Sequence, residues 1–230
     1  MWIKICGITS IEDAEMVLAA GADAIGFVFA ESPRRVSPKT ARDIIQRLAP
    51  SVEKIGVFVD ATGSEMAETM EVAGLSGVQL HGSVDGLKDF RGGVGKERES
   101  IRVLQVVRYD GDANRFALEL RKLHEHQFLG DRSSAVLVDT CVAGKQGGTG
   151  VAFDWQAARD SFRREAPHLR LIAAGGLHPE NVRNAIQTLR PWGVDVSSGV
   201  ESAPGRKDPN RVSAFVRAAR EADAELGERS

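Results

Sequence analysis

The sequence predicts an α/β fold of the (β/α)8 (TIM) barrel type, in which eight parallel strands close into a ring surrounded by helices. Two observations predict it: eight short apolar runs rich in Val, Ile or Leu, and segments with helical spacing of apolar residues between them. A length of 230 residues also suits one such barrel, which typically has about 250 residues. We therefore expect residues 1–230 to form a single barrel domain, with a doubly wound open sheet as the structural alternative.

The eight apolar runs are short, as expected of strands in a parallel sheet that is buried on both faces. They are Trp2–Cys6, Ala24–Phe29, Lys54–Val59, Gly77–Leu80, Ile101–Val107, Ala135–Val138, Leu169–Ala174 and Gly193–Val196. None of them approaches the roughly 18 apolar residues that a membrane span needs.

Capping residues mark several helix starts between these runs. Ser10 with Asp13 resembles a capping box, and Ser37-Pro38 places a cap residue before a proline at the first helical position. His178-Pro179-Glu180 is expected to open a later helix in the same way. The last helix is expected from about Pro209 to Leu226, with its apolar residues along one stripe.

Charge and cysteine content favour a cytoplasmic protein that binds a small molecule. The 32 acidic and 30 basic residues give a net charge of −2, so no global positive field would hold a nucleic acid. Cys6 and Cys141 lie far apart and match neither a disulfide framework nor a metal-binding pair, which favours a reducing compartment. No signal peptide or membrane span is readable. We expect no metal and no membrane or nucleic-acid partner.

In a barrel of this kind, chemistry belongs at the carboxyl ends of the strands, where the following loops converge. Polar and glycine residues follow or end five of the predicted strands. They are Cys6-Gly7, His81-Gly82, Asp139-Thr140, Gly175-Gly176 and Ser197-Ser198-Gly199. We expect these residues to meet at one rim and to form the functional site.

Short motifs along the chain identify a family by their joint order. They are Lys-Ile-Cys-Gly-Ile-Thr (4–9), Gly-Ala-Asp-Ala-Ile-Gly-Phe-Val-Phe (21–29), Ser-Pro-Arg (32–34), Gly-Val-Phe-Val-Asp (56–60), Val-Gln-Leu-His-Gly (78–82), Val-Asp-Thr (138–140), Gly-Gly-Thr-Gly (147–150), Phe-Asp-Trp (153–155) and Asp-Val-Ser-Ser-Gly-Val-Glu (195–201). Each string is weak alone, but their order over residues 4–208 is specific. The chain resembles the phosphoribosylanthranilate isomerases of tryptophan biosynthesis.

The resemblance implies an Amadori rearrangement of N-(5'-phosphoribosyl)anthranilate to 1-(2-carboxyphenylamino)-1-deoxyribulose 5-phosphate, without a cofactor. In the family the residue matching Asp139 protonates the ring oxygen as general acid, and the residue matching Cys6 then acts as general base. Such an isomerisation does need one acid and one base. We expect a nearby positive charge to lower the pKa of the Cys6 thiol. The alternative for Cys6 is a small buried apolar residue.

The phosphate is expected where the seventh and eighth strands end. Gly175 and Gly176, with Ser198 and Gly199, would bring backbone N–H groups to it together with the N-terminus of a short helix. The alternative is that these glycines only form tight turns.

Two side chains are candidates for other parts of the substrate. Arg34 is expected to bind the anthranilate carboxylate, because a guanidinium matches a carboxylate with two parallel hydrogen bonds and the family has its arginine there. The following Val-Ser-Pro (36–38) favours Arg34 over Arg35. His81 is expected to hydrogen-bond the substrate or to tune Cys6, with a purely structural histidine as the alternative.

Three further hypotheses concern neighbouring residues. Lys4 and Asp195 should form a buried ion pair, because they share the inward face of strands that adjoin in a closed barrel. Cys141 could be joined to Cys6 by an oxidant, or it is an incidental loop thiol. Residues 144–150, rich in glycine, are expected to form a mobile active-site loop.

Two alternative functions stay open at this point. A non-catalytic phosphate-binding barrel would bind an anion without turnover, which intact Cys6 and Asp139 argue against. A sugar-phosphate isomerase of histidine biosynthesis typically uses two aspartates, whereas Cys6 stands on the first strand here. The expected partner is a small phosphorylated substrate, and the sequence leaves open whether the protein is a monomer or a homodimer.

Overall fold

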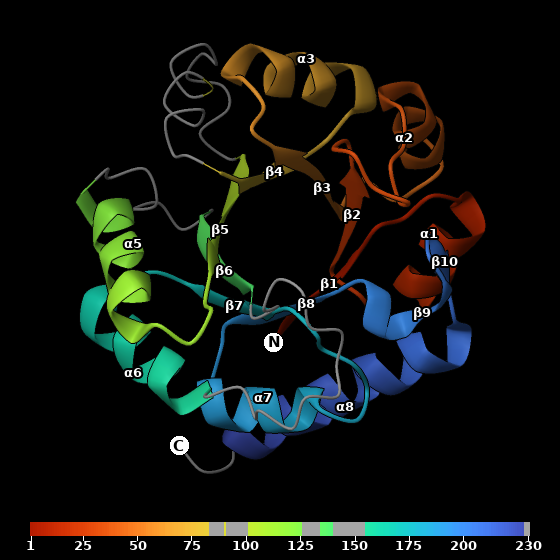
Figure 1. Cartoon of the computed structure of the whole chain (residues 1–230). Helices are drawn as coiled ribbons and strands as arrows, with labels where there is room; N and C mark the ends of the chain where they lie inside the picture. Colours follow the sequence, from red (N-terminus) through yellow and green to blue (C-terminus); the bar gives the residue numbers. More distant parts are fainter. Residues whose placement is uncertain (83–89, 91–100, 126–133, 140–154, 228–230) are drawn as a thin grey trace.

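The computed structural model describes residues 1–82, 90, 101–125, 134–139 and 155–227. Eight parallel strands form a closed barrel in sequence order, and β1 pairs with β8 to complete the ring (Figure 1). The strands are β1 (Trp2–Cys6), β2 (Ala24–Val28), β3 (Glu53–Val59), β4 (Gly77–His81), β5 (Arg102–Arg108), β6 (Ala135–Asp139), β7 (Leu171–Ala174) and β8 (Gly193–Val196). The predicted (β/α)8 barrel is confirmed, and the open-sheet alternative is wrong.

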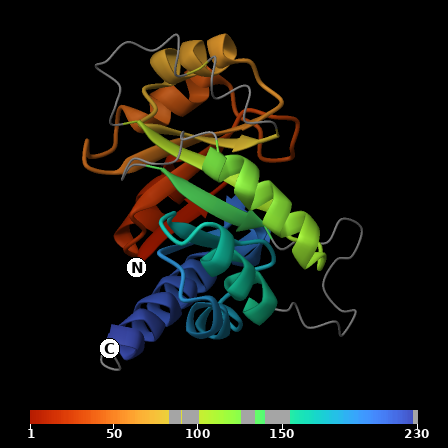
Figure 2. The same cartoon turned by 90° about the vertical axis from the view of Figure 1, so that its left-hand side faces the viewer.

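The helices lie outside the ring of strands (Figures 1 and 2). They are α1 (Ile11–Ala19), α2 (Pro38–Ile45), α3 (Gly63–Ala73), α5 (Ala113–Glu125), α6 (Trp155–Glu165), α7 (Val182–Leu189) and α8 (Pro209–Gly227). After β8 the chain forms the short helix η2 (Ser198–Val200) and a small hairpin of β9 (Glu201–Ala203) and β10 (Arg206–Lys207) before α8 begins. No helix in the described part of the chain is long and apolar enough to cross a membrane.

Two of the three predicted helix caps are confirmed. The Ser10 hydroxyl accepts the Asp13 N–H at the start of α1, and the Ser37 hydroxyl accepts the Thr40 N–H at the start of α2. The prediction that residues 178–180 open a helix is wrong, because α7 begins at Val182. The intervening residues form a turn, in which the Asn181 side chain accepts the His178 N–H at 2.8 Å.

The bounds of β1 and β8 match the predicted runs, and the ends of the other strands differ from them by one or two residues. The seventh strand begins at Leu171 rather than Leu169, because the Leu169 N–H donates to the Ala166 carbonyl and closes the turn after α6. At the carboxyl ends, β4 and β6 each run one residue further than predicted. His81 and Asp139 are therefore the last residues of their strands, and the strands themselves fix their backbones.

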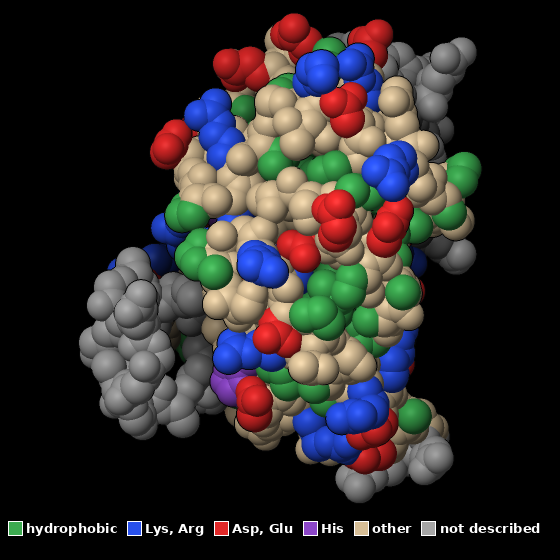
Figure 3. All heavy atoms as spheres, turned by 90° about the vertical axis from the view of Figure 1, so that its right-hand side faces the viewer, with side chains coloured by type: hydrophobic (Ala, Val, Ile, Leu, Met, Phe, Trp, Pro, Cys, Tyr) green, Lys and Arg blue, Asp and Glu red, His purple; other side chains and the backbone are tan. Residues whose placement is uncertain are grey.

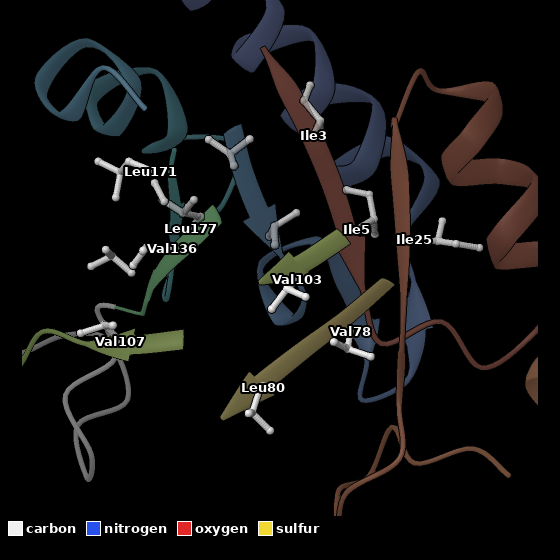
Figure 4. Packing of buried hydrophobic residues seen from close by; sticks show 14 of the residues in the cluster. Ile3, Ile5, Ile25, Val78, Leu80, Val103, Val107, Val136, Leu171 and Leu177 are labelled. Atoms are coloured by element: carbon white, nitrogen blue, oxygen red, sulfur yellow. The ribbon is translucent and has the colours of Figure 1, made fainter. Parts of the chain in front are cut away.

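Apolar side chains fill two regions. The larger cluster lies between the strands and the helices, and its members include Ile3 and Ile5 of β1 and Val78 and Leu80 of β4 (Figure 4). The smaller cluster lies inside the barrel and includes Trp2, Leu104 and Ile172. Successive strand residues alternate between these two regions, so Trp2, Lys4 and Cys6 share the interior face of β1.

Acidic and basic side chains are interspersed on the face that Figure 3 shows. Their near balance agrees with the net charge of −2. An anionic ligand would therefore be held by local groups rather than by the field of the whole surface.

Candidate active site

The barrel interior changes from apolar to polar along its axis. Near the amino ends of the strands it holds Trp2 and other members of the small apolar cluster, which extends along β7 as far as Ala174, the last residue of that strand. Two residues further along the strands, Lys4 of β1, Gln79 of β4 and Asp195 of β8 are buried polar side chains. A further two residues along, Cys6 ends β1 and His81 ends β4. The polar layers thus lie toward the rim where the sequence predicts a site.

Lys4 and Asp195 form the predicted buried ion pair. The two residues are direct partners in the β1–β8 ladder, and Lys4 Nζ lies 2.8 Å from Asp195 Oδ1. Lys4 Nζ also donates to Gln79 Oε1 at 2.9 Å. Burial alone would lower the pKa of Lys4, but the negative charges of Asp195 and of the Cys6 thiolate together outweigh burial and raise that pKa. The ammonium group is therefore retained inside the barrel.

The Cys6 thiol is buried among positive groups. Burial raises the pKa of this thiol, while the charges of Lys4 and Lys207 oppose the rise. The two ammonium groups lower the thiol pKa as expected, but the cost of removing a thiolate from water, together with the negative charge of Asp195, exceeds their effect, so the net shift of this pKa is upward. Gly26 of β2 makes room here, since a Cβ on it would lie 2.8 Å from Cys6 Sγ and 3.0 Å from Lys4 Cε.

His81 and Asp139 end two strands on the same rim. Gln79 Nε2 lies 3.2 Å from His81 Nε2, so His81 is hydrogen-bonded to the polar layer beneath it. Burial lowers the pKa of His81, and the charge of Asp139 is the largest influence that opposes this shift. His81 is thus linked to Lys4 through the side chain of Gln79.

Arg34 is held by a second buried charge cluster. Its Nε donates to Glu201 Oε1 at 2.8 Å and its Nη2 to Glu201 Oε2 at 2.6 Å. Glu201 Oε1 also accepts from Lys207 Nζ at 2.8 Å. Burial alone would raise the pKa of Glu201, but the hydrogen bonds from Arg34 and Lys207 lower it below its ordinary value. The carboxylate therefore stays charged and fixes one edge of the guanidinium.

The loops after β7 and β8 touch one another. Gly175 and Gly176 have φ angles of +80° and +61°, a region that favours glycine. A Cβ on Gly199 would lie only 1.9 Å from the Leu177 carbonyl oxygen, so this close approach requires glycine. The two predicted glycine-containing loops, including Ser198 at the start of η2, are thus brought side by side.

Some predicted features are not described by the structure. Cys141 and residues 144–150 lie outside the described residues, so the redox hypothesis and the mobile-loop prediction stay predictions. Within the described ranges there is no group of three or more His, Cys, Asp or Glu that could hold a metal ion.

The family model described as N-(5'phosphoribosyl)anthranilate (PRA) isomerase matches residues 3–218. The chain belongs to the N-(5'-phosphoribosyl)anthranilate isomerase family. A curated member from Pelobacter propionicus is 40% identical over 224 residues, which are 97% of each chain. A member from Thermotoga neapolitana is 43% identical over 223 residues, covering 95% of this chain and 98% of that one.

Solved structures of N-(5'-phosphoribosyl)anthranilate isomerases have the same fold. The crystal structure of the Thermotoga maritima enzyme gives a TM-score of 0.81 at 35% identity, covering 96% of this chain and 99% of that one. A further isomerase structure, in complex with reduced 1-(o-carboxyphenylamino)-1-deoxyribulose 5-phosphate, gives a TM-score of 0.76 at 35% identity with the same coverage. Another, of monomers generated from the dimeric Thermotoga maritima isomerase, gives a TM-score of 0.75 at 34% identity, again covering 96% of this chain and 99% of that one.

Several residues of this site were not among the candidates from sequence. Gln79, Glu201 and Lys207 each make buried hydrogen bonds to a candidate residue or to its partner. Gln79 and Glu201 lie inside the motifs that carry the family resemblance, at 78–82 and 195–201. Gln79 could have been predicted as a site residue, because it is a polar residue within an otherwise apolar strand. Lys207 could not, because its contacts depend on the fold of the β9–β10 hairpin.

Proposed function

We propose that this protein isomerises N-(5'-phosphoribosyl)anthranilate to 1-(2-carboxyphenylamino)-1-deoxyribulose 5-phosphate by general acid-base catalysis. The observation that carries the proposal is the placing of Cys6 and Asp139 at the carboxyl ends of β1 and β6 in a closed barrel. A thiol and a carboxyl at this rim supply the base and the acid that the reaction needs. Membership of the isomerase family identifies the substrate.

Asp139 is the acid that opens the sugar ring. Its proton goes to the ring oxygen, the bond between C1' and that oxygen breaks, and the anthranilate nitrogen forms a protonated Schiff base with C1'. Cys6, as thiolate, then takes the proton from C2'. The electrons of that C–H bond form a C1'–C2' double bond and neutralise the nitrogen, which gives an enolamine. Proton transfer to C1' and loss of the hydroxyl proton complete the aminoketose.

The charges around Cys6 suit the role of base. Its thiol pKa is raised by burial, so the thiolate is the less stable form and accepts a proton readily once formed. The positive charges of Lys4 and Lys207 oppose this rise in pKa and so stabilise the thiolate. The proposed step uses only side chains of this chain and a proton, and it needs no cofactor.

The remaining candidates bind the substrate. Gly175 and Gly176 with Ser198 and Gly199 take the phosphate, since the two loops lie side by side at the usual phosphate position of such barrels. Arg34 takes the anthranilate carboxylate. Glu201 occupies its Nε and one side of Nη2, which leaves Nη1 and the outer edge of the guanidinium for the ligand.

We further propose that the protein works in the cytoplasm on this small phosphorylated molecule, without nucleic acid, as a monomer or a homodimer. The balanced charge of −2 supports the exclusion of nucleic acid. The relative from Thermotoga maritima is dimeric, which supports the homodimer.

Turnover by matched variants tests the proposal. Purified protein is mixed with freshly generated N-(5'-phosphoribosyl)anthranilate without added metal, and the loss of substrate fluorescence is followed. The proposal predicts fast loss that Cys6→Ser and Asp139→Asn each abolish. A well-folded protein without turnover would favour a binding barrel instead, and loss unaffected by either substitution would contradict the assigned acid and base.

A further inference from the structure

Gln79 lies between the buried ion pair and His81. Its side chain is on the interior face of β4, and the residue is only 3% exposed. Its Oε1 lies 2.9 Å from Lys4 Nζ, and its Nε2 lies 3.2 Å from His81 Nε2. One amide thus bridges a charged amine and an imidazole.

The direction of this bridge follows from the chemistry of the three groups. A lysine ammonium has donors only, so the amide atom that faces it must be the oxygen. Lys4 is held in this form by Asp195 at 2.8 Å. The NH2 end of Gln79, which is also a donor only, must then face His81. A donor needs an acceptor, so His81 Nε2 carries no proton.

We propose that Gln79 is a positioning residue that fixes His81 as the neutral tautomer with its proton on Nδ1. Since Nε2 is engaged by Gln79, Nδ1–H is the hydrogen bond that His81 can offer to the substrate. His81 is therefore a donor in the site, not a proton acceptor. This inference rests on the proposed function for the identity of the substrate, whereas the tautomer rests on the geometry alone.

The charges around His81 agree with a neutral ring. Burial lowers its pKa, and the cations Arg108 and Lys4 lower it further, while Asp139 and Asp195 oppose them. The pKa of His81 is lowered overall, so its imidazole stays neutral to a lower pH than that of an exposed histidine. A proton on Nε2 would also place two N–H groups against each other at the Gln79 contact.

The nitrogen NMR signals of the imidazole test the tautomer without any need for turnover. The protein is labelled with 15N-histidine, and comparison with His81→Asn identifies the His81 signals among those of the five histidines. At pH 7 to 8 we expect a non-protonated Nε2 and a protonated Nδ1. A protonated Nε2 in this range would overturn the inference.

Two substitutions of Gln79 test its role, with a matched control. In Gln79→Glu the carboxylate still accepts from Lys4 but now requires an N–H from His81, so we expect Nε2 to become protonated and the pKa of His81 to rise. Gln79→Met removes the donor without adding charge, and we expect His81 to become a mixture of tautomers. Gln187→Met removes an amide on α7 that donates to Glu225, away from β4, and should leave the His81 signals unchanged. His81 signals that are the same in all three variants would contradict the role of Gln79.

Two substitutions of His81 test the donor role. The Asn side chain can place an N–H near the position of Nδ1–H, so His81→Asn should keep kcat within about tenfold of the parent. His81→Leu lacks the donor and should lose on the order of 100-fold in kcat. Equal losses in the two variants would contradict donation to the substrate. If the parent protein shows the predicted tautomer but no turnover, the proposed function fails and the assignment of the proton stands.

Discussion

At the scale of single residues, the candidate site is defined by short distances between the Cys6 thiol and its neighbours. Cys6 and Lys4 are two positions apart on one strand face, and Gly26 of the next strand lies against both. The thiol could be predicted from the motif around it. The direction of its pKa shift could not, because burial and the charge of Lys207, which is distant in sequence, both depend on the fold.

Replacing Gly26 by Ala tests the space around Cys6. The added methyl would lie 2.8 Å from Cys6 Sγ, so we expect the thiol to shift and activity to fall, with the free energy of unfolding reduced by about 1–3 kcal/mol. Gly227→Ala is the control, because no atom lies within 4 Å of a Cβ there. Denaturant unfolding and turnover are measured on both. Unchanged activity in Gly26→Ala would show that the site tolerates this displacement.

Replacing Glu201 by Gln tests the second charge cluster. The pKa of Glu201 is lowered in the fold, so its carboxylate adds stability that is complete above its ordinary value near 4.5 and is lost as the pH falls through the lower folded value. We expect Glu201→Gln to flatten this loss of stability at acid pH. We also expect a higher KM, because Arg34 loses the partner that fixes it. Unfolding curves from pH 3 to pH 7 that parallel those of the parent would contradict the assignment.

At the scale of elements, the strands were predicted better than the start of α7. Short apolar runs rich in Val, Ile and Leu indicate strands directly, and the seven-residue motif at 195–201 contains both Asp195 and Glu201. The start of α7 depends on the Asn181 side chain, which accepts the His178 N–H and donates to the Gly176 carbonyl. Such a turn is set by local hydrogen bonds that a Pro-Glu pair in the sequence does not reveal.

The ion pair between Lys4 and Asp195 lies at the β1–β8 seam, where these two strands pair and close the barrel. Lys4→Met leaves the Asp195 carboxylate buried without its cation, and we expect the free energy of unfolding to fall by about 3–5 kcal/mol. The double variant Lys4→Met with Asp195→Leu removes both charges and should be more stable than the single variant. Denaturant unfolding measures all three proteins. A double variant less stable than Lys4→Met would mean that the pair is not the source of the loss.

At the scale of the whole molecule, the closed barrel joins strands that are far apart in sequence by hydrogen bonds. The number of apolar runs predicted eight strands, and closure follows from the pairing of Trp2 through Ile5 with Gly193 through Val196. The contacts across this seam could be predicted only by assuming closure. The prediction of an ion pair between Lys4 and Asp195 assumed that the barrel is closed, and this ion pair is confirmed.

We therefore expect residues 1–230 to unfold as one domain. Strands from both ends of the chain are hydrogen-bonded to one another, so loss of the β1–β8 seam opens the whole ring. Scanning calorimetry should give a single transition whose calorimetric and van't Hoff enthalpies agree. Two separated transitions would contradict a single domain.

The role of Cys6 as general base is tested most directly by asking whether this residue removes the proton from C2' of the substrate. N-(5'-Phosphoribosyl)anthranilate that carries deuterium at C2' is mixed with the parent protein and with Cys6→Ser, and deuterium at this carbon is followed by NMR. We expect the parent to remove the deuterium as the aminoketose forms, and to turn over the deuterated substrate more slowly than the ordinary one. We expect Cys6→Ser to leave the deuterium at C2'. Equal loss of deuterium with both proteins would contradict the assignment of Cys6 as the base.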